Sequence, residues 1–82
     1  MRNEMKNVNV IATLESDDNS LSAYVSSHDI SASAMASTMG ELDKKLRETL
    51  QDALEVSKEY NLEYPHELDG ADIHILYELA TV

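Results

Sequence analysis

Residues 38–60 read TMGELDKKLRETLQDALEVSKEY and carry the longest helical repeat of apolar residues in the chain. At about 100° per residue, one arc of such a helix gathers mostly apolar side chains, and charged side chains occupy the remainder. The arc consists of Leu42, Leu46, Thr49, Leu50, Ala53, Leu54, Val56, Ser57 and Tyr60. A helix with a single apolar arc is expected to cover one face of a sheet.

The ends of this helix are marked in the sequence. Thr38 is a good N-cap, and Glu41 follows at the spacing at which the hydroxyl and the carboxylate can each satisfy a free N–H group of the other residue. The helix is therefore predicted to begin at Met39, which requires a non-helical approach. Asn61 is a plausible stop, and Pro65 rules out continuation. Charged pairs four residues apart support the helix, namely Glu41–Lys45, Asp43–Arg47 and Lys44–Glu48.

Two short strands are predicted before the helix. Residues 8–15 and residues 21–26 alternate apolar with polar side chains, and residues 16–20 between them are rich in turn formers. This order predicts an antiparallel hairpin with a loop of four or five residues. The side chains expected on its apolar face are Val8, Val10, Ala12, Leu14, Leu21, Ala23 and Val25.

Two further segments complete the sheet. Residues 31–36 read SASAMA, in which alanine favours a helix and the alternation favours a strand. We interpret them as a third strand because the capped helix needs a non-helical approach. Residues 71–79 alternate Ile73, Ile75, Tyr77 and Leu79 with Asp72, His74, Leu76 and Glu78, which predicts a last strand after the Asp69-Gly70 turn.

The predicted fold is a single α+β domain over residues 1–82, with the order βββαβ, a curved and mostly antiparallel sheet, and one long helix packed on one face. Residues 1–6 are expected to form a flexible N-terminus. No apolar run approaches the roughly 18 residues of a membrane span, and no secretory signal is recognisable. The chain also lacks cysteine. These features favour a cytoplasmic location.

The net charge of the chain limits the classes of molecule that it is expected to bind. Six Lys and Arg residues against sixteen Asp and Glu residues give a formal net charge of −10. Such a charge repels phosphate backbones and anionic membranes, so direct binding to nucleic acid or to a membrane is not expected. Acidity of this kind can simply keep a small domain in solution. The alternative is attraction of a basic protein partner.

No catalytic, metal-binding or cofactor-binding motif is recognisable. The three histidines, His28, His66 and His74, lack the paired spacing of metal ligands. His28 lies beside Ser27 and Asp29, but adjacent residues seldom align for proton relay. We interpret this segment as a polar loop. The sequence therefore predicts neither an enzyme nor a bound cofactor.

Two surfaces remain as candidates for binding. The first is the sheet face away from the helix, on which an interface and a solvated face are equally compatible with the sequence. Its residues would be Ile11, Tyr24, Met35, His74 and Leu76. The second is the exposed edge of the sheet, where another subunit or a partner could add a strand.

Four short motifs resemble the HicB family: Ser22-Ala23-Tyr24-Val25, the helix opening STMGEL at 37–42, the helix body LRETLQDALE at 46–55, and ELDG at 67–70. The similarity runs from about Val8 to Leu79 and is to the N-terminal, partial ribonuclease H-like domain of HicB-type antitoxins. Family members usually have Gly-Asp-Thr where this chain has Ala36-Ser37-Thr38, and an alanine where it has Leu42.

The resemblance implies a domain that binds a small basic toxin of the HicA type, an mRNA-cleaving ribonuclease, and masks its active surface. Family members commonly add a C-terminal DNA-binding domain, which we do not find in this sequence. The chain is then expected to be either a shortened member or a member that does not bind DNA. The alternative is a stand-alone oligomeric domain with a structural or regulatory role and no toxin partner. A homo-oligomer is expected in both cases.

Overall fold

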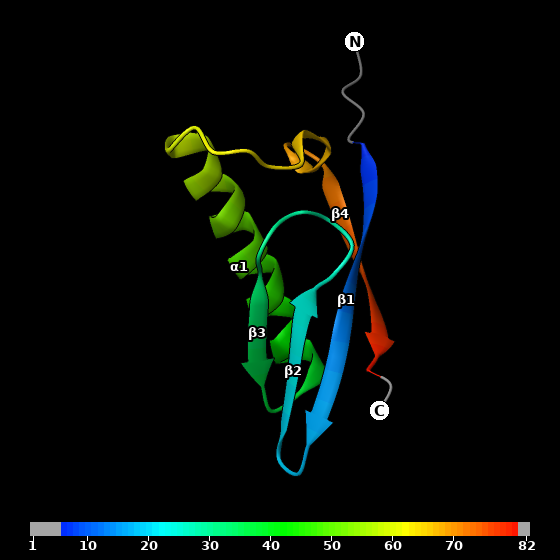
Figure 1. Ribbon diagram of the computed structural model, residues 1–82. Helices are drawn as coiled ribbons and strands as arrows, with labels where there is room; N and C mark the ends of the chain where they lie inside the picture. Colours follow the sequence, from blue (N-terminus) through cyan, green and yellow to red (C-terminus); the bar gives the residue numbers. More distant parts are fainter. Residues whose placement is uncertain (1–5, 81–82) are drawn as a thin grey trace.

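The computed structural model describes residues 6–80, which form one helix over one face of a four-stranded sheet (Figure 1). The elements are β1 (Asn7–Asp17), β2 (Ser20–Val25), β3 (Ser33–Ala36), α1 (Met39–Glu59), the 3-10 turn η1 (His66–Leu68) and β4 (Asp72–Leu79). This arrangement confirms the predicted α+β class and the βββαβ order. Of the N-terminal segment expected to be flexible, residues 1–5 lie outside the described residues.

The strands are ordered β3-β2-β1-β4, so β3 and β4 are the two edges of the sheet. β2 pairs antiparallel with both β1 and β3, whereas β4 pairs parallel with β1 from Asn7↔Asp72 to Leu14↔Leu79. The parallel pairing follows from the path of α1, which carries the chain back to the end of the sheet where β1 begins (Figure 1). The sheet is therefore mostly antiparallel, as predicted.

The hairpin is tighter than predicted. β1 extends to Asp17 and pairs with Ser20, which leaves only Asp18 and Asn19 as the turn in place of a loop of four or five residues. Polar strand ends remain in the ladder because each added pair satisfies backbone groups without burying the side chains. The third strand is shorter than predicted, since residues 31 and 32 precede its first pair, Tyr24↔Ser33.

The helix ends largely as its sequence predicts. The Glu41 N–H donates to Thr38 Oγ1 at 3.2 Å, which confirms the N-cap. Within residues 6–80 the Glu41 side chain does not return the bond, so only half of the predicted capping box forms. At the other end Asn61 has a φ of 59°, and the Leu62 N–H donates to the Ser57 carbonyl at 2.8 Å. This pattern is a Schellman motif, and it confirms Asn61 as the stop.

The core lies between the helix and the sheet. Its buried members include Val10 and Ala12 of β1, the four helix leucines Leu42, Leu46, Leu50 and Leu54, and Leu68 of η1. The prediction was wrong for Val56 and Tyr60, whose side chains are 47% and 67% exposed. The helix packs mainly over β2 and β3, and its C-terminal end leans beyond the short strand β3 (Figure 1). The last turn of α1, after Leu54, therefore extends past the described strands of the sheet.

Within residues 6–80, no helix combines the length and the apolar composition that a membrane crossing requires.

Candidate functional site

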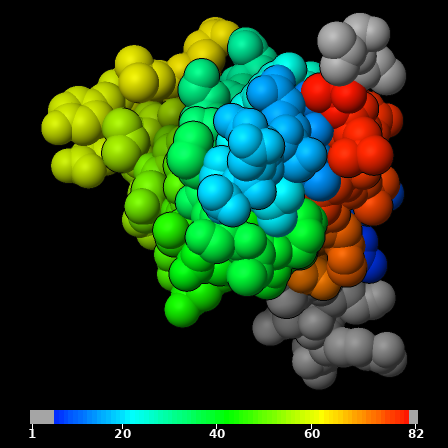
Figure 2. All heavy atoms as spheres, turned by 90° about the horizontal axis from the view of Figure 1, so that it is seen from below, coloured from blue at the N-terminus to red at the C-terminus, as the bar shows by residue number. Residues whose placement is uncertain are grey.

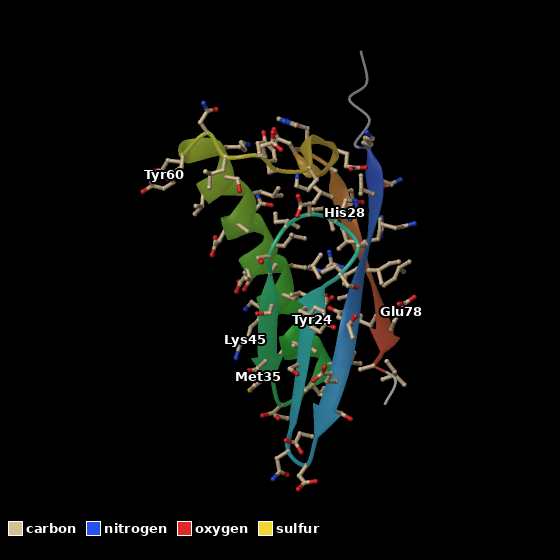
Figure 3. The ribbon with its side chains drawn as sticks, viewed as in Figure 1. Tyr24, His28, Met35, Lys45, Tyr60 and Glu78 are labelled. Carbon is tan, nitrogen blue, oxygen red and sulfur yellow. The ribbon has the colours of Figure 1, made fainter. Side chains whose placement is uncertain are left out.

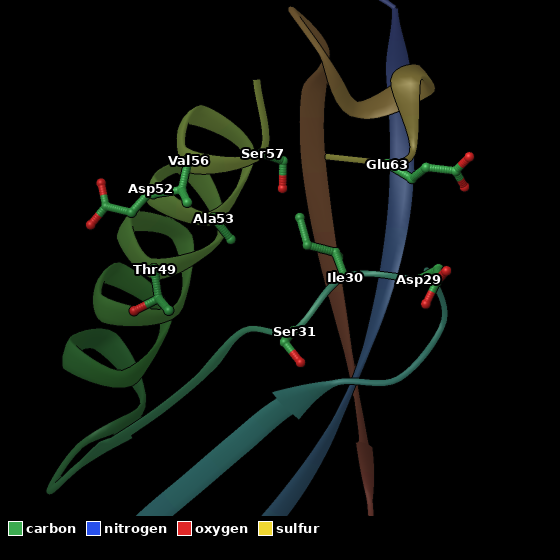
Figure 4. A pocket seen from close by; sticks show the side chains of 9 residues that line it. All are labelled: Asp29, Ile30, Ser31, Thr49, Asp52, Ala53, Val56, Ser57 and Glu63. Atoms are coloured by element: carbon green, nitrogen blue, oxygen red, sulfur yellow. The ribbon is translucent and has the colours of Figure 1, made fainter. Parts of the chain in front are cut away.

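The overhanging end of α1 and the loop between β2 and β3 enclose an open groove (Figure 4). Its volume is about 450 Å³. Apolar atoms of Ile30, Ala53 and Val56 line it together with the hydroxyl side chains of Ser31, Thr49 and Ser57. In Figure 4 the Ile30 and Ser57 side chains point toward each other across the groove. The groove thus offers a mostly apolar floor between two separate segments of the chain.

Three carboxylates rim this groove: Asp29 from the loop, Asp52 from α1 and Glu63 from the connector after α1. Figure 4 shows the Asp52 and Glu63 carboxylates directed outward from it. No Lys or Arg lines the groove, and none of the three acids forms an ion pair with another residue among residues 6–80. An apolar floor with a negative rim suits a partner segment that combines apolar and basic side chains.

Sequence reasoning did not find this groove, because it treated residues 27–30 only as a connecting loop. Ile30 is an apolar residue within that polar loop, and this was the available signal. Val56 gave a second signal, because its place in the apolar arc suggested burial, whereas the residue is 47% exposed. Neither residue indicates a groove until the fold brings the loop beside the helix.

The five residues predicted on the far face of the sheet do lie there, but in two separate patches. Ile11 and Leu76 are register partners on β1 and β4, and His74 lies two residues from Leu76 on the same face. Tyr24 and Met35 lie on β2 and β3, toward the opposite edge (Figure 3). The polar residues Thr13, Ser22, Ser26 and Ser33 share this face, so it is not one continuous apolar surface.

The structure brings Ser27, His28 and Glu67 together. Ser27 Oγ lies 2.8 Å from His28 Nδ1, and His28 Nε2 lies 3.8 Å from a Glu67 carboxylate oxygen. The second distance exceeds that of a hydrogen bond, and Ser27 and Glu67 are exposed to water. Ser27 Oγ also accepts the Ile11 N–H at 2.9 Å, which replaces a ladder bond beyond the end of β2. The contact explains the loop structurally without requiring a catalytic role.

The other histidines are held by local contacts. The His66 ring lies 4.4 Å from the Tyr64 ring, and His74 Nε2 lies 3.4 Å from an Asp72 carboxylate oxygen. Among residues 6–80, no group of three or more His, Asp or Glu side chains is arranged to hold a metal ion.

A polar network joins the helix to β4. The Tyr77 hydroxyl donates to Asp43 Oδ1 at 2.6 Å, and Arg47 Nε donates to Asp43 Oδ2 at 2.8 Å. Partial burial raises the pKa of Asp43, but the hydrogen bonds from Tyr77 and Arg47 and the charge of Arg47 together lower it below its ordinary value. Partial burial and then the Asp43 hydrogen bond raise the pKa of the Tyr77 phenol. Of the three charged pairs predicted along the helix, only Asp43–Arg47 forms among the described residues.

The comparisons with known proteins do not extend this description. No family model, curated protein or solved structure matches the chain. The similarity to HicB-type antitoxins therefore remains a prediction from the four sequence motifs.

Proposed function

We propose that this chain is a protein-binding module of the antitoxin type that acts without catalysis. In this proposal it binds a small basic ribonuclease resembling HicA toxins and covers the active surface of that enzyme in the cytoplasm. The HicB-like motifs suggest the identity of the partner, and the acidity of the chain suggests its charge. In this proposal the chain itself binds no nucleic acid, cofactor or metal.

The acid-rimmed groove is the observation that carries this proposal. An acidic surface alone would serve solubility, but the groove combines three carboxylates with the exposed side chain of Val56 and the partly buried side chain of Ile30. Apolar area supplies binding free energy, and charge at the rim mainly accelerates the encounter with a partner of opposite charge. A basic protein with an apolar anchor would use both.

The first experiment is affinity purification of the tagged chain from its native host, followed by identification of any retained small basic protein. The RNA cleavage activity of that protein is then measured with and without added chain. Suppression of cleavage at a fixed stoichiometry supports the proposal. A retained protein without ribonuclease activity, or one whose activity the chain does not reduce, contradicts the antitoxin role.

A matched pair of variants tests the groove. The first variant replaces Asp29, Asp52 and Glu63 with Asn, Asn and Gln, and the control replaces three acids of the hairpin end with the corresponding amides. The control acids are Glu15, Asp17 and Asp18. Both variants change the net charge equally. With about 0.5 kcal/mol for each exposed ion pair, the groove variant should bind roughly tenfold more weakly than the control. Equal losses would place the partner elsewhere.

A second candidate function is that of a self-associating structural or regulatory domain without a toxin. The long open edge of β4 is the observation in its favour. Recovery of the chain alone as a closed oligomer, with no retained protein, would support this candidate over the antitoxin role.

A further inference from the structure

The outer edge of β4 presents unpaired backbone groups. The Asp72 N–H donates to the Lys6 carbonyl and the Ala80 N–H donates to the Leu14 carbonyl, so even-numbered residues of β4 direct their backbone groups toward β1. In a parallel pair, the odd-numbered residues of β4 then direct their backbone N–H and C=O groups away from β1. These outward residues are Ile73, Ile75, Tyr77 and Leu79. Within residues 6–80, their only recorded outer-edge contact is the bond from Arg47 Nη1 to the Ile73 carbonyl, at 2.7 Å.

The two edges of the sheet differ in their protection. β3 has only four residues, and Lys45 Nζ lies 3.4 Å from its Met35 carbonyl. A short edge strand with a lysine across it resists pairing with another chain. β4 has eight residues, and among the described residues only its Ile73 carbonyl, at the start of the strand, is covered by a helix side chain, that of Arg47. Figure 2 shows β4, in orange and red, along one flank of the molecule, away from the C-terminal end of the helix.

We propose that a second copy of this chain pairs with β4 along this edge, antiparallel and about a two-fold axis at Leu76. The two four-stranded sheets would become one continuous sheet. Ile75 of each copy then exchanges both backbone hydrogen bonds with Tyr77 of the other. The inference specifies the homo-oligomer that the sequence leads us to expect, and it requires no toxin.

The side chains on the helix-facing side fit this register. Ile75 faces Tyr77 of the second copy, and Ile73 faces Leu79, which is 73% exposed in the single chain. A hollow of about 160 Å³ lies beside Ile73, lined by residues that include Leu50 and the Arg47 side chain. Leu79 of the second copy would lie against this hollow. The surface of this hollow is mostly polar, so the apolar contact that Leu79 gains in the dimer is with the Ile73 side chain opposite it.

The side chains on the face of the sheet away from α1 favour this register over registers shifted by two residues. At the axis Leu76, which is 50% exposed, meets Leu76 of the second copy. On each side of the axis His74 faces Glu78, so an imidazole meets a carboxylate. A shift of the second copy by two residues in one direction would place Asp72 opposite Glu78, which brings like charges together. The same shift in the other direction would place Leu76 opposite Glu78 and lose the leucine contact.

Cysteine cross-linking tests the axis on the purified chain, so its outcome is independent of any toxin. The protein has no cysteine, and a non-hydrogen-bonded antiparallel pair has a Cα separation of about 4.5 Å, within the range of a disulfide. Leu76→Cys should form a disulfide-linked dimer under mild oxidation. Met35→Cys is the control, since Met35 is exposed on the same face at the opposite edge. Equal rates of linkage for the two variants would overturn the proposal.

A charge exchange tests the register. His74→Glu should weaken the dimer roughly tenfold, because both symmetric pairs turn from complementary to repulsive. Adding Glu78→Lys to His74→Glu should restore the dimer. The dissociation constants are measured by sedimentation velocity, and circular dichroism checks that each variant folds. A wild-type chain that is monomeric at every soluble concentration, or a double variant no tighter than His74→Glu, would overturn the proposal.

Discussion

Tyr77 links the protonation of one side chain to the stability of the fold. Its phenol donates to Asp43, and its pKa is raised by partial burial and then by that bond. A group whose pKa rises on folding contributes fully below its unfolded pKa, and the contribution is lost as pH rises through the folded value. Above about pH 10, the free energy of unfolding of the wild type should therefore fall more steeply than that of Tyr77→Phe.

Urea unfolding at a series of alkaline pH values measures this difference. Tyr24→Phe is the control, because the Tyr24 hydroxyl makes no hydrogen bond within residues 6–80 and its ring is 47% exposed. The difference in slope between the wild type and Tyr77→Phe should exceed the difference between the wild type and Tyr24→Phe. Parallel curves for Tyr77→Phe and the wild type would show that the contact with Asp43 does not raise the pKa of the Tyr77 phenol.

Thr38 gives a second prediction for a single residue. Its hydroxyl oxygen accepts the Glu41 N–H, and loss of a helix N-cap costs about 1 kcal/mol. Thr38→Ala should lower the free energy of unfolding by this amount. Ser37→Ala, one residue earlier and outside the cap, should leave it almost unchanged. Equal effects of the two substitutions would mean that the hydroxyl does not cap the helix.

The helix as an element is stabilised unevenly along its length. Leu46 is fully buried over the sheet, whereas Val56 lies on the same predicted arc but is largely exposed. Leu46→Ala should cost about 2–5 kcal/mol through lost burial and a residual cavity. Val56→Ala should change the free energy of unfolding little. Thermal and urea unfolding measure both, and a large loss for Val56→Ala would place the helix end against the sheet.

The same contrast shows what the sequence could predict about the elements. The apolar periodicity of residues 38–60 predicted the helix, because four leucines at a four-residue spacing are buried wherever a sheet lies beneath them. It could not predict that the C-terminal end of α1 extends past β3, because the length of β3 depends on its pairing with β2 and not on the pattern of the helix. The far-face residues were placed on the correct face by alternation alone. Their division into two patches depends on strand order, and the groove depends on the path of a loop, so neither was predictable from local spacing.

For the molecule as a whole, net charge predicts that salt affects its two proposed associations in opposite directions. Each copy carries a formal charge of −10, so two copies repel one another, and salt screens this repulsion over a Debye length of about 8 Å at physiological ionic strength. Raising the salt concentration should therefore strengthen the β4 dimer. A complex with a basic partner depends on attraction, and the same salt should slow its formation.

Sedimentation velocity of the chain alone, and association rates with the purified partner, should be measured over one salt series at constant pH. A dimer that weakens with salt would mean that the two His74–Glu78 contacts outweigh the net repulsion. His74→Glu replaces both contacts with like-charge pairs and adds to the net repulsion, so its dimer should strengthen with salt more steeply than that of the wild type. A partner complex whose association rate is independent of salt would assign its formation to the apolar floor of the groove and not to the carboxylates at its rim.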